Sequence, residues 1–132
     1  MVVDDEEFCI ATMRAMLEKF GINIEYQVDF CIDGLESTKQ LKKAFDMDMS
    51  YRIIFTDFSM PNMNGIEATK KMRKYLDQMK KPKSEQPIII GVTGHILEDY
   101  KIEGLNAGMD LIVPKPLYSK DFKMYLKKYG IL

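Results

Sequence analysis

Five side chains with the chemistry of a phosphoryl-transfer site follow short apolar runs of the sequence: Asp4, Asp5, Asp57, Thr93 and Lys115. Carboxylates about 4–5 Å apart repel one another by several kcal/mol unless a cation neutralises them. Mg²⁺ would do so, because it binds one or two carboxylates together with carbonyl and water oxygens. A carboxylate can also be the nucleophile that receives a phosphoryl group, and a lysine can stabilise the charge in transfer. If the fold gathers these residues, they could hold Mg²⁺ and form an aspartyl-phosphate.

The apolar runs are predicted strands of a parallel sheet. They are rich in Val, Ile, Phe and Tyr, and several are continuously apolar, which is typical of parallel strands covered on both faces. The expected strands are Val2–Val3, Ile24–Cys31, Tyr51–Thr56, Pro87–Thr93 and Leu111–Val113.

Amphipathic segments with apolar residues three or four positions apart separate these runs and predict helices. The expected helices are Glu6–Phe20, Gly34–Phe45, Asn64–Met79, Leu97–Ala107 and Ser119–Tyr129, the last with Ser119 as its N-cap. Strict alternation of strand and helix predicts a doubly wound, five-stranded parallel sheet, a flavodoxin-like (βα)5 fold with three α/β/α layers. Ligands of such sheets bind at the carboxyl ends of the strands, where the five side chains should lie.

Length and charge exclude several classes of protein. The 132 residues suit one domain, and nineteen Lys and Arg against twenty Asp and Glu leave a formal net charge of −1. No global field would therefore hold nucleic acid or an anionic membrane. The lysine-rich stretch Lys70–Lys83 is interpreted as a solvated helix face. Only three residues precede Asp4, so either the first strand is a stub or the chain is cut from a longer protein. We favour the second and expect residues 1–132 to be a single domain with a truncated first strand.

Cysteine usage and hydropathy indicate a reduced, cytoplasmic setting. Cys9 and Cys31 cannot make a disulfide framework and are expected to be free thiols. The densest apolar stretch, Ile88–Val92, is far shorter than the ~20 residues that span a bilayer. We therefore expect a cytoplasmic chain without direct membrane contact.

The ordered motifs resemble the receiver domain of two-component response regulators. The match is collinear, covers almost the whole chain and is specific as a set although each piece is weak. Its parts are Val2-Val3-Asp4-Asp5-Glu6, Phe55-Thr56-Asp57-Phe58-Ser59-Met60-Pro61-Asn62-Met63-Asn64-Gly65, Val92-Thr93-Gly94, Ala107-Gly108-Met109-Asp110 and Pro114-Lys115-Pro116.

The resemblance implies an Mg²⁺ site with distinct ligand roles. Asp57 would be the phosphoacceptor and also a metal ligand, and Asp5 would bind the ion directly. Asp4 would act mainly through bound water, and Ser59 would offer its backbone carbonyl.

The resemblance also implies how a phosphoryl group is held. Thr93 would supply the hydroxyl that senses phosphate, Lys115 would pair with a phosphoryl oxygen, and the peptide bond before Pro116 would often be cis. The sequence departs from the family at Ile112, where an aromatic residue commonly reports phosphorylation to the surface.

By resemblance the chain would be a switch rather than an enzyme. A histidine kinase or a histidine phosphotransfer protein would donate the phosphoryl group, and the surface around the fourth helix and fifth strand would respond. A phosphorylation-dependent dimer is compatible with this role, and the short first strand favours the receiver of a hybrid histidine kinase.

Three alternatives stay open. A haloacid-dehalogenase-like phosphatase also uses an aspartate nucleophile, but its acid–base aspartate would fall at Ser59. A degenerate receiver would be an interaction module without phosphorylation, although such a scaffold has no need of repelling carboxylates. A nucleotide-binding module is disfavoured because no glycine-rich loop follows the first strand.

Overall fold

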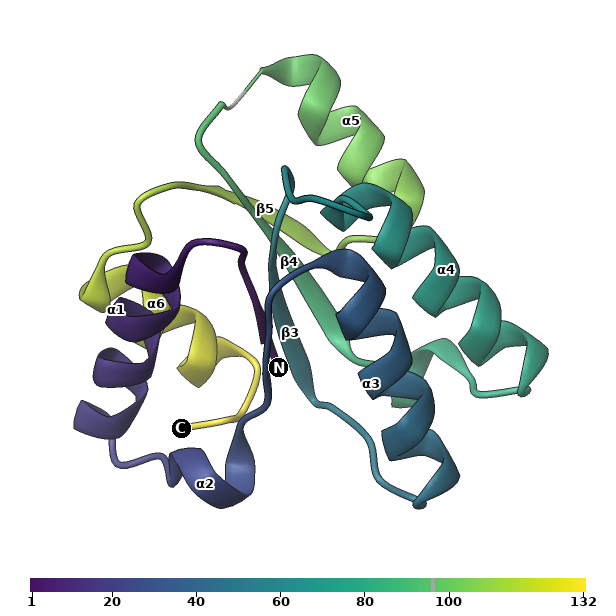
Figure 1. Ribbon diagram of the computed structural model, residues 1–132, viewed down its shortest axis with the longest axis horizontal. Coiled ribbons are helices and arrows are strands. Elements are labelled where there is room, and N and C mark those ends of the chain that lie inside the picture. The colour runs from purple at the N-terminus through teal and green to yellow at the C-terminus, as the bar shows by residue number, and fades with distance from the viewer. Residues whose placement is uncertain (96) are drawn as a thin grey trace.

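The computed structural model describes residues 1–95 and 97–132. Within them, five parallel strands form one sheet in the order β2-β1-β3-β4-β5 (Figure 1). The strands are β1 (Val2–Val3), β2 (Phe30–Cys31), β3 (Ile53–Asp57), β4 (Ile88–Thr93) and β5 (Leu111–Pro114). The doubly wound, parallel fold predicted from the alternation of elements is confirmed.

Helices cover both faces of the sheet. In Figure 1, α1 and α6 lie on one side, and α3, α4 and α5 lie on the other, which gives three layers. The helices are α1 (Glu7–Lys19), α2 (Ile24–Gln27), α3 (Gly34–Asp46), α4 (Gly65–Gln78), α5 (Glu98–Ala107) and α6 (Ser119–Lys128), with a 3-10 turn, η1 (Lys83–Glu85). Among the described helices, none combines the length and apolar character needed to cross a bilayer.

Each face of the sheet has its own core. Successive residues of a strand point to opposite faces, and β3 is buried along its whole length. Ile54 therefore packs with Leu41 and Met72 beneath α3 and α4. Phe55 packs with Phe122 of α6, and their ring centroids are 4.9 Å apart. This two-sided burial explains why the central strands are continuously apolar.

The predicted second strand is wrong over most of its length. Ile24–Gln27 form the short helix α2, and only Phe30–Cys31 pair with β1. The Asn23 side chain accepts hydrogen bonds from the N–H groups of Glu25 and Tyr26, at 3.1 and 3.4 Å. This cap satisfies backbone donors locally, so the apolar run folds as a helical turn.

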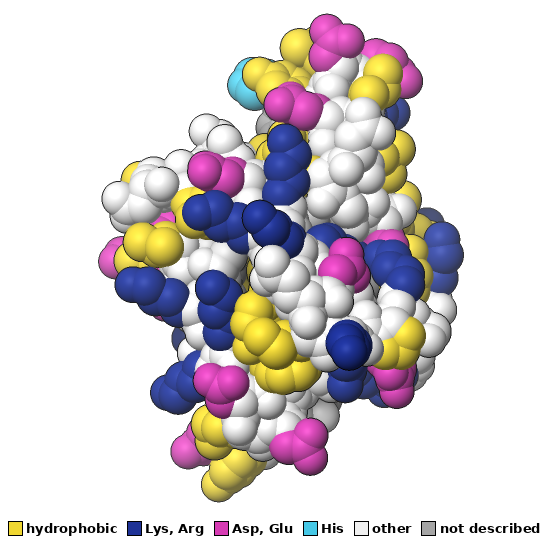
Figure 2. All heavy atoms as spheres, turned by 90° about the vertical axis from the view of Figure 1, so that its right-hand side faces the viewer, with side chains coloured by type: hydrophobic (Ala, Val, Ile, Leu, Met, Phe, Trp, Pro, Cys, Tyr) yellow, Lys and Arg dark blue, Asp and Glu magenta, His cyan; other side chains and the backbone are white. Residues whose placement is uncertain are grey.

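One smaller expectation fails, and another holds with one exception. Ser119 is the first residue of α6 rather than its cap, and Tyr118 at the cap position makes no side-chain hydrogen bond to the helix. Lys and Arg side chains spread over the face seen in Figure 2. The lysines of Lys70–Lys83 are exposed, apart from the half-buried Lys81, but Arg73 in the same stretch is buried. Its guanidinium donates to the carbonyls of Gly108 and Pro87, at 3.0 and 2.9 Å.

The same guanidinium also lies 2.9 Å from Asp110, which in turn accepts the Ile89 N–H at 2.8 Å. Arg73 thereby ties α4 to the start of β4 and to the α5–β5 turn. The N–H donors of a buried guanidinium must be hydrogen-bonded, because an unpaired buried charge would cost several kcal/mol of folding free energy.

Candidate functional site

Strand register brings the predicted site residues to one edge of the sheet. Val3 of β1 pairs with Thr56 of β3, so the next residues, Asp4 and Asp57, are neighbours. Thr93, the last residue of β4, pairs with Pro114 of β5, and Lys115 follows directly. The carboxyl ends of β1, β3, β4 and β5, which are adjacent strands of the sheet, thus meet at the position expected for a ligand.

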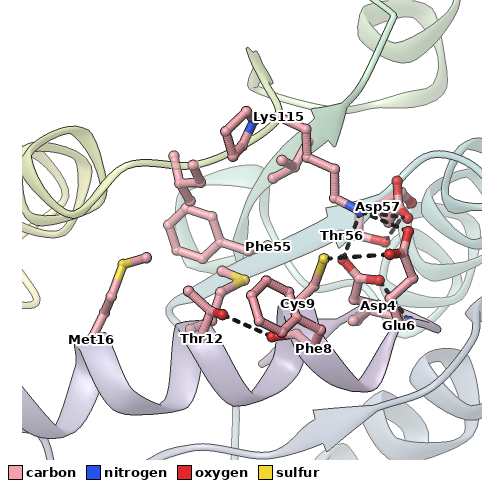
Figure 3. Close-up of a pocket in the computed structure, with 15 residues that line it drawn as sticks. Asp4, Glu6, Phe8, Cys9, Thr12, Met16, Phe55, Thr56, Asp57 and Lys115 are labelled. Atoms are coloured by element: carbon pink, nitrogen blue, oxygen red, sulfur yellow. Dashed lines mark hydrogen bonds and ion pairs between the residues drawn. The ribbon is translucent and has the colours of Figure 1, made fainter.

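Lys115 joins the two buried aspartates. Its Nζ lies 3.1 Å from Asp57 Oδ2 and 2.9 Å from Asp4 Oδ2, and it is 3.8 Å from Glu6 Oε1 (Figure 3). Asp4 and Asp57 are only 3% and 7% exposed, so this ammonium is their main neutralising charge in the structure. The Lys115–Pro116 peptide bond is cis, as the resemblance implies.

The protonation equilibria reflect this sharing of one cation. Burial raises the pKa of Asp57, and the hydrogen bond and charge of Lys115 oppose the rise only in part, while Asp4 adds to it. Burial alone would lower the pKa of Lys115, but hydrogen bonds to Asp4 and Asp57 and their charges raise it above its usual value. Lys115 is therefore a permanent cation at neutral pH.

The acidic residues fit a hard divalent cation. Asp4, Asp5, Glu6 and Asp57 each offer one carboxylate oxygen, and these oxygens all lie within 4.8 Å of one another. Four carboxylates exceed the charge of one lysine, and an all-oxygen donor set suits Mg²⁺. Asp5 is exposed, so it is accessible to an incoming hydrated ion.

Thr93 is buried at this edge, but its hydroxyl is engaged with the adjacent loop. Its Oγ1 accepts the His95 N–H at 3.1 Å and lies 3.3 Å from the His95 carbonyl. The Thr93 side chain is thus hydrogen-bonded to the start of the β4–α5 connection. His95 is an exposed loop residue, as expected.

Contacts at Gly65 and Asn62 fix the loop between β3 and α4. A Cβ built on Gly65 would lie 2.1 Å from the Asp57 carbonyl oxygen, so only glycine lets α4 begin so close to the site. The Asn62 side-chain amide donates to Asp33 Oδ2 at 2.7 Å, and Asp33 also caps α3. Ser59 lies in this loop, two residues after Asp57, and is exposed.

A cavity of about 300 Å³ adjoins the charged cluster. Figure 3 shows Phe55 and Met16 along it and Asp4, Glu6, Asp57 and Lys115 at one end. The remaining lining is mostly apolar and comes from α1, β1, β4 and the segment after β5, including Phe8, Cys9, Met13, Val92 and Leu117.

Sequence reasoning assigned no role to Glu6 or Cys9. Glu6 belongs to the carboxylate cluster, and Cys9 Sγ lies 3.9 Å from Glu6 Oε2. The only signal in the sequence was a third acidic residue directly before a helix. Both cysteines are free, as predicted.

Solved structures share the fold. The receiver domain of Saccharomyces cerevisiae Ssk1, crystallised with the histidine phosphotransfer protein Ypd1, matches with a TM-score of 0.81 and 24% identity, over 98% of this chain and 86% of that one. The receiver domain of the sensor histidine kinase PA1611 of Pseudomonas aeruginosa, with a magnesium ion in its active site cleft, matches with a TM-score of 0.76 and 22% identity, over 97% and 93%.

The sequence relatives include a hybrid histidine kinase and a sensor protein. Hybrid signal transduction histidine kinase G of Dictyostelium discoideum is 31% identical over 130 residues, which are 98% of this chain and 3% of that kinase. Aerobic respiration control sensor protein ArcB of Escherichia coli is 28% identical over 129 residues, 98% of this chain and 15% of that protein. The chain thus spans a small part of these relatives.

The family model of the response regulator receiver domain matches residues 1–127. This match covers every strand and nearly all of the last helix. Together with the fold and the site, it shows that the chain belongs to the response regulator receiver domain family.

Proposed function

We propose that Asp57 accepts a phosphoryl group from a phosphohistidine and that its phosphorylation switches a protein-interaction surface. The observation that carries this proposal is the ammonium of Lys115, held 3.1 Å from Asp57 and 2.9 Å from Asp4 at the carboxyl edge of a receiver fold. This cation lies between two buried carboxylates, where it could also neutralise part of the charge of a phosphoryl group bound to Asp57.

In the proposed reaction an oxygen of the Asp57 carboxylate attacks the phosphorus of the donor. The new O–P bond forms as the P–N bond to the donor imidazole breaks, and the imidazole nitrogen takes up a proton. Lys115 stabilises the charge on the transferred group. The chain is the acceptor in this step and assists its own phosphorylation, so we do not class it as an enzyme.

Asp5, Asp57 and the backbone carbonyl of Ser59 would hold Mg²⁺, with Asp4 acting mainly through bound water. When bound, the ion would offset the repulsion within the acidic cluster and attract the phosphoryl oxygens. The magnesium in the PA1611 receiver cleft supports this assignment. Glu6 adds a carboxylate that the predicted ligand set lacked.

Thr93 is the proposed sensor of the phosphoryl group. Its hydroxyl can donate to a phosphoryl oxygen only by giving up its present contact with the His95 carbonyl. The β4–α5 connection would therefore rearrange when Asp57 is phosphorylated.

A histidine kinase or a histidine phosphotransfer protein is the proposed donor. The Ssk1 receiver was crystallised with its phosphotransfer partner, and the relatives ArcB and kinase G carry this kind of segment within longer chains. We further propose that residues 1–132 act as one receiver domain on the cytoplasmic side of a hybrid kinase, with dimerisation as one response to phosphorylation.

Intact mass after incubation with acetyl phosphate and Mg²⁺ tests the proposal. The wild-type chain should gain the mass of one phosphate, and Asp57→Asn should gain none. Asp121→Asn, which makes the same change on the exposed start of α6, should behave as wild type. A wild-type chain without added phosphate would favour the degenerate-receiver alternative.

A further inference from the structure

Phe58 directly follows the proposed phosphoacceptor, and its ring is enclosed by two glycines. A Cβ built on Gly91 of β4 would lie 2.4 Å from Phe58 Cε1, and one built on Gly104 of α5 would lie 3.1 Å from Phe58 Cζ. Phe58 is 8% exposed. The ring therefore fills space that larger residues at these positions would occupy, and it contacts both β4 and α5.

Tyr100, in the first turn of α5, packs on the same ring. The two ring centroids are 6.3 Å apart with an interplanar angle of 86°, an edge-to-face arrangement. Tyr100 is 40% exposed, so this aromatic pair leads from a buried position beside Asp57 to the molecular surface. Figure 2 shows hydrophobic side chains gathered near the single histidine, at the end of the molecule where α5 begins.

Ile112 contacts the same helix at Gly104, but it is not part of the aromatic pair. A Cβ built on Gly104 would lie 2.6 Å from Ile112 Cδ1, so this aliphatic side chain packs beneath α5. It is half-buried and belongs to the core under α4 and α5. In contrast to Tyr100, it has no aromatic ring and no polar end.

Two sets of contacts therefore link the site to α5. Thr93 ends β4 and is hydrogen-bonded to His95, which lies in the connection that leads to Glu98, the first residue of this helix. Phe58 is covalently linked to Asp57 and abuts the helix at Gly104. We propose that Phe58 and Tyr100 are positioning residues that carry the phosphorylation state of Asp57 to the exposed face of α5, in place of residue 112. This inference rests on the proposed function of Asp57.

Fluorine NMR of the chain labelled with meta-fluorotyrosine tests the relay. The Tyr100 resonance is assigned as the one missing in Tyr100→Phe, and phosphate uptake from acetyl phosphate and Mg²⁺ is followed by intact mass. Phosphorylation should shift this resonance in the wild type. Phe58→Leu should take up phosphate and lose most of the shift, whereas Ile112→Val should keep it.

Hydrogen exchange of α5 gives a second readout through a surface variant. Tyr100→Leu changes a partly exposed residue, so the fold should persist, and phosphorylation should alter exchange of Glu98–Ala107 less than in the wild type. A full Tyr100 shift in phosphorylated Phe58→Leu, or its loss in Ile112→Val, would overturn the relay alone. Absence of added phosphate in the wild type would overturn the role of Asp57 and the relay with it.

Discussion

Lys115 donates a hydrogen bond of 3.1 Å to Asp57, although 58 positions separate the two residues. The contact exists because β3 and β5 end at the same edge, on either side of β4. It places the Lys115 ammonium on one oxygen of the carboxylate that is proposed to accept the phosphoryl group.

Replacing this lysine should destabilise the metal-free chain. Lys115→Ala leaves Asp4 and Asp57 buried without their shared cation, so we expect the free energy of unfolding to fall by about 1–3 kcal/mol at neutral pH. Urea denaturation measures the change, and added Mg²⁺ should recover part of it. Lys120→Ala, at an exposed position of α6, is the matched control. A variant as stable as wild type without metal would contradict the ion-pair geometry.

The pH dependence of stability should reveal the buried carboxyl of Asp57. Burial raises its folded-state pKa above the unfolded value. Its contribution is therefore fully present below the unfolded pKa and is lost as pH rises through the folded pKa. Asp57→Asn does not ionise, so its stability relative to wild type should increase as the pH rises above the unfolded-state pKa of an aspartate, about 3.9. Parallel stability curves for the two metal-free proteins would argue against this shift.

Loss of Asp5 should weaken magnesium binding and leave the fold intact. Asp5 is exposed but shares the carboxylate cluster, so Asp5→Ala should reduce Mg²⁺ affinity by roughly tenfold or more. Isothermal titration measures the affinity, and chelation of Mg²⁺ should stop phosphate uptake from acetyl phosphate in the wild type. Glu7→Ala removes a nearby acid outside the cluster and should titrate as wild type. Equal affinity in Asp5→Ala would show that Asp5 is not a ligand.

Arg73 should matter for stability and not for chemistry. Arg73→Met removes donors to two backbone carbonyls and to Asp110. We expect a loss of about 3 kcal/mol in urea denaturation, because the carbonyls of Gly108 and Pro87 and the partly buried Asp110 carboxylate all lose a donor. Phosphate uptake should persist under conditions in which the variant is folded. Lys74→Met, at the exposed neighbouring position, should change stability little. An equally small effect for Arg73→Met would show that the contacts of Arg73 do not stabilise the fold.

The site was predictable because it follows from alternation and register. Once apolar runs are placed as parallel strands, residues directly after them, such as Asp4 and Lys115, must lie on one edge. The positions are seen in the structure, but the roles of all the site residues stay predictions: Asp4, Asp5, Asp57, Ser59, Thr93 and Lys115. Arg73 could not be foreseen, because its acceptors at Gly108 and Pro87 come from distant segments that only the folded chain brings together.

The second strand failed for a local reason. Ile24 and Val28 have the side chains of a strand, and period-based reasoning extends the strand through them. One amide side chain, that of Asn23, instead caps a helical turn, and the intervening Tyr26 is left 80% exposed. A cap worth about 1 kcal/mol is enough where the competing strand would be at a sheet edge.

The contacts that Arg73 makes with Gly108, Pro87 and Asp110 also limit how the molecule can respond to phosphorylation of Asp57. They fasten α4, the first residues of β4 and the α5–β5 turn to one another at the end of the sheet farthest from the phosphoacceptor. Because this end is fixed, α5 would respond by pivoting about it rather than by sliding along the sheet. Displacement would then be greatest at the amino-terminal turn of α5, where Tyr100 meets solvent.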